Sequence, residues 1–156
     1  MDADRSAWLA RALVALVGLI VGASGTAEAG RRPALPGPIP AQADAVIDGD
    51  TLRVRARIWL DQEVDTIVRL EGIDAPELDG SCGSERELAA RARDRLAELI
   101  GDGVIALLQV RHDKYGGRVL ATVTDARGRD VGAALVRAGL ARAYQGGARV
   151  SWCPIE

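Results

Sequence analysis

Hydrophobic and polar residues alternate along two neighbouring stretches of the chain, residues 52–60 and 64–70. In the first stretch, apolar side chains at even positions alternate with a row of three arginines, Arg53, Arg55 and Arg57. Strict alternation is typical of β-strands that bury one face. Residues 60–63 separate the two stretches, so the pattern predicts a long antiparallel hairpin. We interpret the arginine row as a solvated outer face.

A helical period follows the hairpin. Ser84-Glu85-Arg86-Glu87 resembles a capping box and predicts a helix over residues 85–100, ended by Gly101. Its expected buried stripe is Leu88, Ala92, Leu96 and Leu99. Later elements are predicted as strands over residues 104–111 and 118–124, a helix over 131–138 capped by Asp130, and an extended piece over 140–144. Short antiparallel strands with an inserted helix favour an α+β fold built on a small Greek-key β-barrel.

The N-terminal residues predict export. Residues 12–27 are apolar and uncharged, and Ala27-Glu28-Ala29 fits a small-x-small cleavage pattern. We therefore expect a signal peptide over residues 1–29 and a periplasmic or secreted protein, with an uncleaved membrane anchor as the alternative. Residues 30–40 hold four of the six prolines and predict a linker. The folded domain is then expected over residues 41–156.

Composition limits the possible partners. The chain has 156 residues, a net charge of -2 and only 3% aromatic residues. No overall basic field favours nucleic acid, so binding of that kind would need a local basic patch. The two cysteines, Cys82 and Cys153, predict a disulfide in an exported domain. Chain entropy limits its stabilisation to roughly 4 kcal/mol.

Two acidic clusters bracket the predicted hairpin, Asp48-Gly49-Asp50 before it and Asp74-Ala75-Pro76-Glu77 after it. Antiparallel pairing would bring both clusters, together with Arg69, to the same end of the hairpin. Carboxylates that close repel one another unless a cation lies among them. Oxygen ligands without a nearby histidine or cysteine favour Ca²⁺ or Mg²⁺ over zinc. Each cluster taken alone also fits an ordinary turn.

A second candidate site lies between the two strands expected at 104–111 and 118–124. Asp113-Lys114-Tyr115-Gly116-Gly117 forms a glycine-containing loop that ends at Arg118. The loop presents groups suited to a phosphate and to a sugar or base, although it also fits a simple hairpin turn. For Arg69, the alternative to a phosphate clamp is a surface ion pair with Glu71 or Asp65.

Four motifs in this order are similar to those of the staphylococcal nuclease (thermonuclease) family, over roughly residues 43–144. They are residues 46–51, 69–77, 113–121 and 134–141. The resemblance implies a five-stranded OB-fold barrel with two or three helices. It also implies a calcium-dependent endonuclease that hydrolyses DNA and RNA. The sequence leaves the oligomeric state open, with a monomer as the default, and we expect no obligate protein partner. Single-stranded or unpaired regions would be favoured, and 3′-phosphate ends would be left.

The resemblance also implies a metal site. Asp50, Asp74 and the backbone carbonyl of Ala75 would bind Ca²⁺ directly. Asp48 would support the metal site without binding the ion directly. The family carries a threonine at the position of Ala75. Because only the backbone carbonyl of this residue would bind the metal, we expect the change of side chain to do little harm.

The resemblance assigns the remaining roles to residues around the metal. Glu77 would orient or deprotonate the attacking water, and Arg69 and Arg118 would hold the scissile phosphate. Lys114 and Tyr115 would contact the substrate. Preorganised positive groups of this kind stabilise the charge that develops on the phosphoryl oxygens.

Further departures from the family pattern and two rival functions remain. Gly117 is an extra residue before Arg118, and a third C-terminal helix is missing. We expect a Cys82–Cys153 bridge to pin the shortened tail to the loop after Glu77. The rivals are an inactive OB-fold module that binds nucleic acid and a calcium-stabilised structural domain. A complete set of catalytic residues argues against the first, and the second has no use for the two arginines.

Overall fold

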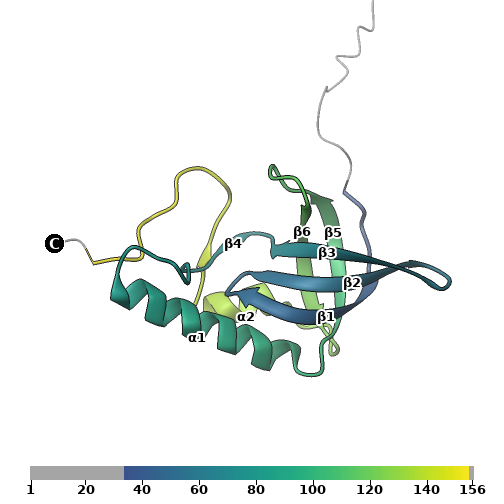
Figure 1. Cartoon of the computed structure of the whole chain (residues 1–156), viewed down its shortest axis with the longest axis horizontal. Coiled ribbons are helices and arrows are strands. Elements are labelled where there is room, and N and C mark those ends of the chain that lie inside the picture. Colours follow the sequence, from purple (N-terminus) through teal and green to yellow (C-terminus); the bar gives the residue numbers. More distant parts are fainter. Residues whose placement is uncertain (1–33, 155–156) are drawn as a thin grey trace, which may run out of the picture. The chain divides into compact units, whose positions relative to one another are not determined.

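The computed structural model describes residues 34–154 (Figure 1). The elements are β1 (Ile39–Asp48), β2 (Thr51–Trp59), β3 (Gln62–Leu70), β4 (Ile73–Asp74), α1 (Gly83–Ile100), β5 (Val104–His112), β6 (Arg118–Asp125), α2 (Val131–Arg137) and β7 (Arg142–Ala143). None of the helices in this part of the chain is long and apolar enough to cross a membrane. The predicted signal peptide lies outside the described residues.

Five strands close into a barrel in the order β1-β2-β3-β6-β5, which confirms the predicted α+β OB-fold architecture. Neighbouring strands are antiparallel, except that β3 and β6 run parallel, with Arg69 opposite Leu120. β1 pairs with β2 along most of its length and with β5 through its first residues. Irregularities after Ala43 and Val46 interrupt the β1–β2 register. Such bulges bend a strand and let it join both edges of the barrel.

The predicted hairpin is present as β2 and β3, but its turn is shorter than expected. Only Leu60 and Asp61 lie between the strands. The apolar side chains of β2 from Leu52 to Ala56 are buried, while its arginines are exposed. Arg55 pairs with Asp44 at 3.0 Å on that outer face. The alternating pattern therefore sorted the two faces correctly near the barrel, but not toward the tip of the hairpin, where Ile58, Leu60 and Val64 are exposed.

Helix α1 differs from its prediction at its start and in its buried face. Cys82 is the N-cap and contributes no side-chain cap, so the expected Ser84 capping box is wrong. Glu85 instead accepts a hydrogen bond from the Ser81 amide at 3.0 Å, which ties the preceding turn to the helix. The buried residues are Glu85, Ala89, Ala92, Leu96 and Ile100. Leu88 and Leu99 are only partly buried, because small alanines face the barrel and permit close approach.

The two ends of the described chain also refine the prediction. β1 begins at Ile39, and Leu35 already pairs with Val110, so ordered structure begins before Ala41. The predicted extended piece is the short strand β7, which pairs with β4. Within the described residues, no helix or strand follows Ala143. The tail is irregular there, as the missing third helix led us to expect.

Candidate active site

Strand register brings the two acidic clusters to one end of the hairpin. Thr51 pairs with Arg69, and the Leu70 amide donates to the Asp50 carbonyl at 2.8 Å. Asp50 and Asp74 are each only 4% exposed. The turn between β1 and β2 also packs closely on its surroundings, because a Cβ added to Gly49 would lie 2.7 Å from the Ala92 Cβ on α1. The acidic turn is therefore fixed by both the barrel and the helix.

Arg69 bridges the two buried aspartates. Its Nη1 contacts Asp50 Oδ2, its Nη2 lies 3.8 Å from Asp74 Oδ1, and Nη2 also donates to the Ile73 carbonyl at 3.4 Å. Arg69 is itself only 8% exposed. This placement rules out a surface ion pair with Glu71, which pairs with Arg111 instead. Two carboxylates and one guanidinium thus share a region of low dielectric.

Asp48 and Ala75 hold Asp50 from two sides. Asp48 Oδ1 accepts a hydrogen bond from the Asp50 amide at 2.9 Å, and the Ala75 amide donates to Asp50 Oδ2 at 3.2 Å. Burial raises the pKa of Asp48 to about 6, and the neighbouring Asp50 charge acts in the same direction. Asp48 therefore lies where a group supporting Asp50 is expected.

Asp74 offers an acceptor suited to a cation. Its Oδ2 accepts from the Trp152 indole at 3.3 Å, whereas its buried Oδ1 accepts no hydrogen bond. Oδ1 lies 2.9 Å from Arg149 Nε as an ion pair. This buried oxygen thus faces the positive charge of Arg149 and lies 3.8 Å from Arg69 Nη2, so it occupies a position that favours a cation. The oxygen donors of Asp50 and Asp74 fit a hard cation such as Ca²⁺ or Mg²⁺.

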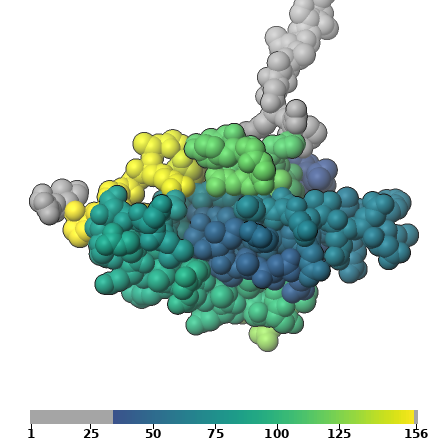
Figure 2. Space-filling model, in the orientation of Figure 1, coloured from purple at the N-terminus to yellow at the C-terminus, as the bar shows by residue number. Residues whose placement is uncertain are grey.

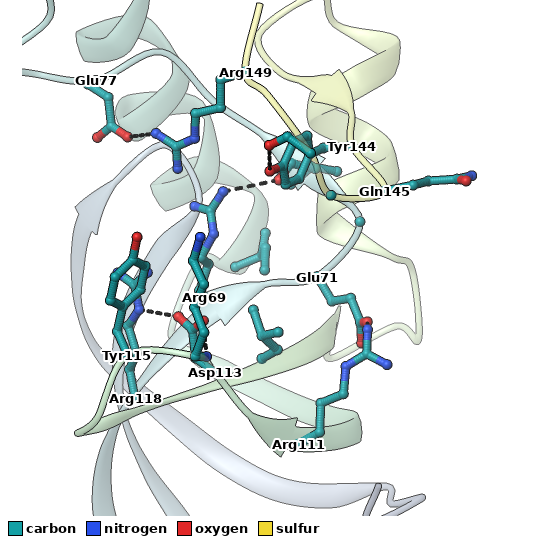
Figure 3. Close-up of a pocket in the computed structure, with 17 residues that line it drawn as sticks. Arg69, Glu71, Glu77, Arg111, Asp113, Tyr115, Arg118, Tyr144, Gln145 and Arg149 are labelled. Atoms are coloured by element: carbon teal, nitrogen blue, oxygen red, sulfur yellow. Dashed lines mark hydrogen bonds and ion pairs between the residues drawn. The ribbon is translucent and has the colours of Figure 1, made fainter. Parts of the chain in front are cut away.

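The other predicted residues converge on a single cavity of about 980 Å³. Its lining includes the predicted functional residues Arg69, Glu77, Lys114, Tyr115 and Arg118, together with residues of the C-terminal tail. Figure 3 shows these side chains around the pocket, with Arg69 between Glu77 above and Tyr115 below. Asp50 and Asp74 lie behind Arg69 and do not line the cavity.

The glycine loop delivers Arg118 to this cavity at the first residue of β6. Arg118 Nε contacts Asp113, and its guanidinium lies 4.8 Å from the centre of the Tyr115 ring. The Lys114 ammonium lies 4.9 Å from the same ring. Gly117 adopts a φ of 84°, so the extra residue is accommodated in the turn, where the left-handed region favours glycine. The β3–β6 register then keeps Arg118 on the strand beside Arg69.

Sequence reasoning missed Arg149, which contacts two of the predicted site residues. Its Nη1 contacts Glu77 Oε1 in addition to the contact of its Nε with Asp74. Partial burial lowers the pKa of Arg149, but its hydrogen bond to Glu77 and the charge of Asp74 outweigh burial and raise it. The tail around Arg149 has no periodic pattern. The available signal was the cysteine pair, because Cys153 lies four positions later.

The structure places the two cysteine sulfurs together. Cys82 Sγ and Cys153 Sγ lie 2.18 Å apart, with 6.0 Å between their Cα atoms. The buried carboxylate of Glu85 lies beside them, and its oxygen is 3.5 Å from Cys153 Sγ. The pair lies between the start of α1 and the end of the tail. It brings the tail back across the loop that carries Glu77.

Comparisons with known proteins agree with this arrangement. Residues 67–151 match the family model described as staphylococcal nuclease homologue. A protein of Escherichia coli named as an uncharacterized endonuclease is 29% identical over 113 residues. That match covers 72% of this chain and 66% of the relative.

Proposed function

Because the chain belongs to the staphylococcal nuclease homologue family, we propose that it is a calcium-dependent endonuclease that hydrolyses phosphodiester bonds of DNA and RNA. One observation carries the proposal. A cavity lined by Arg69, Arg118 and Glu77 opens in front of the buried pair Asp50 and Asp74. The similarity to a protein named as an endonuclease supports the same conclusion.

The metal would be held by Asp50, Asp74 and the Ala75 carbonyl, and Asp48 would keep Asp50 in place. A bound Ca²⁺ would supply positive charge to the phosphoryl oxygens. The acceptor of Asp74 without a hydrogen bond and the oxygen-only donor set support this assignment.

The side chains that line the cavity divide the remaining work. Arg69 and Arg118 bind the non-bridging oxygens of the phosphate and stabilise the charge that grows on them during attack. Glu77 orients the attacking water and accepts its proton. Lys114 and Tyr115, at the rim, contact the sugar or base. Arg118 is held ready by Asp113, so it reaches the phosphate with little loss of side-chain freedom.

The finer properties are proposed on the family resemblance. The enzyme cuts the bond to the 5′-oxygen and leaves 3′-phosphate ends, and it prefers single-stranded or unpaired regions. We propose that it acts as a monomer in the periplasm or outside the cell, with an N-terminally anchored form as the alternative. The adjacent sulfurs of Cys82 and Cys153 support an oxidising compartment.

One assay tests the proposal against its rivals. Purified protein is incubated with labelled single-stranded DNA, with and without Ca²⁺, beside the variants Glu77→Gln and Arg118→Ala. Cleavage only with Ca²⁺, reduced about 10²–10³-fold in each variant, supports the nuclease. Tight binding without cleavage identifies an inactive module. Ca²⁺-dependent stabilisation without cleavage or binding identifies a structural domain.

A further inference from the structure

The C-terminal tail is fastened to the barrel just before it reaches the cavity. Strand β7 pairs with β4, which places Arg142 opposite Asp74. The Tyr144 amide then donates to the Gly72 carbonyl at 2.9 Å. The start of the tail is therefore held by the same short strand that carries one of the proposed metal ligands.

The far end of the tail is fastened as well. The guanidinium of Arg142 lies 3.6 Å from the centre of the Trp152 ring and donates to the Ser151 carbonyl at 3.0 Å. Cys153 follows and lies against Cys82. In Figure 2 the yellow tail lies beside the green loop between β5 and β6, and both segments line the cavity. The intervening residues thus form a loop held at both ends.

This loop carries Arg149 to the carboxylates of the site. Its guanidinium reaches Asp74 Oδ1 with Nε and Glu77 Oε1 with Nη1. Figure 3 shows its guanidinium beside the Glu77 carboxylate, with a dashed line joining the two. The Glu77 side chain is 42% exposed, and Arg149 is its ion-pair partner.

A guanidinium and a metal ion cannot share Asp74 Oδ1 freely. A calcium ion binds carboxylate oxygens at about 2.3–2.6 Å, and a second positive charge at the same atom repels it. We propose that Arg149 is a positioning residue with two roles. It competes with the metal for Asp74, and it holds the Glu77 carboxylate toward the attacking water. This inference rests on the proposed nuclease function.

The two roles predict opposite effects of a single substitution. In Arg149→Gln, Asp74 loses its competing cation, so Ca²⁺ binds more tightly. The same variant loses the partner that fixes Glu77, so the catalysed step slows. A residue that served only to stabilise the fold would weaken metal binding and activity together. The opposition of the two changes therefore separates the proposal from a structural role.

Calcium affinity is measured by isothermal titration calorimetry on the full-length protein, without nucleic acid. We expect about 10-fold tighter binding in Arg149→Gln, as expected for removal of a nearby like charge. Arg111→Gln is the matched control, because it removes the same charge from the same cavity but from a residue paired with Glu71. Unchanged or weaker binding in Arg149→Gln overturns the proposal, and so does equal tightening in Arg111→Gln.

Turnover at saturating Ca²⁺ tests the second role. We expect kcat of Arg149→Gln to fall about 10-fold or more with KM changed less, and Arg149→Lys to recover part of the loss. If KM alone changes and kcat stays at the wild-type value, the proposed role of Arg149 in positioning Glu77 is contradicted. If Arg149→Gln does not fold, Arg149→Met, which also lacks the charge, is used in its place, and wild-type calcium affinity together with wild-type kcat in that variant rejects the proposal.

The failures of the two proposals can be told apart. A wild-type protein that neither binds Ca²⁺ nor cleaves DNA contradicts the nuclease function, and with it the inference that depends on it. A wild-type protein that does both, beside an Arg149→Gln variant with unaltered calcium affinity and kcat, contradicts the role of Arg149 alone.

Discussion

The hairpin end and the C-terminal tail both supply groups to one cavity, but they are held by different forces. At the hairpin end, Arg69 lies on β3 and Asp50 lies in the turn immediately before β2, and both are nearly buried. In the tail, Arg149 is 45% exposed and lies on a loop without regular structure. Backbone register fixes the first set, whereas a sulfur pair and a stacked tryptophan fix the second. Rigid strands suit the groups proposed to hold the metal and the phosphate, and a tethered loop suits the partner exchange proposed for Arg149.

The largest effect is expected from removing the buried cation of the hairpin end. Arg69→Ala leaves Asp50 with its carboxylate buried and unpaired, and removes one of the two arginines near Asp74. Breaking a buried ion pair in this way costs about 3–5 kcal/mol. Urea unfolding of the variant and the wild type measures this loss of stability. Arg55→Ala is the control, since this exposed residue pairs on the outer face, and its loss should cost under about 1 kcal/mol. Similar losses in the two variants would contradict the comparison.

Removing the tether should affect the tail more than the barrel. Cys82→Ser with Cys153→Ser opens a link across 71 residues, and chain entropy sets its contribution at no more than about 4 kcal/mol. We expect a clearly lower Tm, and the same decrease in wild-type protein treated with reductant. Reductant should then leave the double variant unaffected. A wild-type Tm that does not respond to reductant would show that the tail is held without the disulfide.

A smaller effect is expected where the acidic turn packs against α1. Gly49→Ala would place a methyl group 2.7 Å from Ala92 Cβ and 2.9 Å from Ala75 Cβ. Overpacking of this kind lowers the free energy of unfolding by roughly 1–3 kcal/mol. Urea unfolding measures the loss, and calcium titration should show weaker binding as the turn shifts. Gly83→Ala meets no atom within 4 Å and serves as the control, with no loss expected.

The smallest effect concerns the barrel end that carries no site residue. Hydrogen bonds from the Arg129 backbone and side chain lower the pKa of Asp125 in the folded protein. A lowered pKa stabilises the fold above the unfolded value of about 3.9, and the stabilisation is lost as pH falls through the folded pKa. Asp125→Asn should therefore lower Tm near neutral pH and flatten its decrease on acidification. If Tm decreases on acidification as steeply in Asp125→Asn as in the wild type, Asp125 does not contribute to that decrease.

The same contrast explains how far the sequence could be used for prediction. Alternating residues placed the strands of the hairpin, and strand register then brought Asp50, Arg69 and Asp74 together as expected. Register is local and follows a repeating pattern, so it can be derived from the chain. Arg149 lies in a segment without such a pattern, and its position depends on long-range contacts of Cys153 and Trp152. The start of α1 was also misjudged, because Glu85 binds the preceding turn instead of closing a capping box.

The parallel pairing of β3 with β6 has a consequence for when the enzyme becomes active. Arg69 and Arg118 are brought together by strands that lie far apart along the chain. Contacts between distant segments form late in folding, since a long loop must close before they contribute. The tail that carries Arg149 is made later still. We therefore expect a partly synthesised or partly folded chain to hold its aspartates without the proposed phosphate clamp of Arg69 and Arg118, and so to leave the nucleic acid of the producing cell uncut.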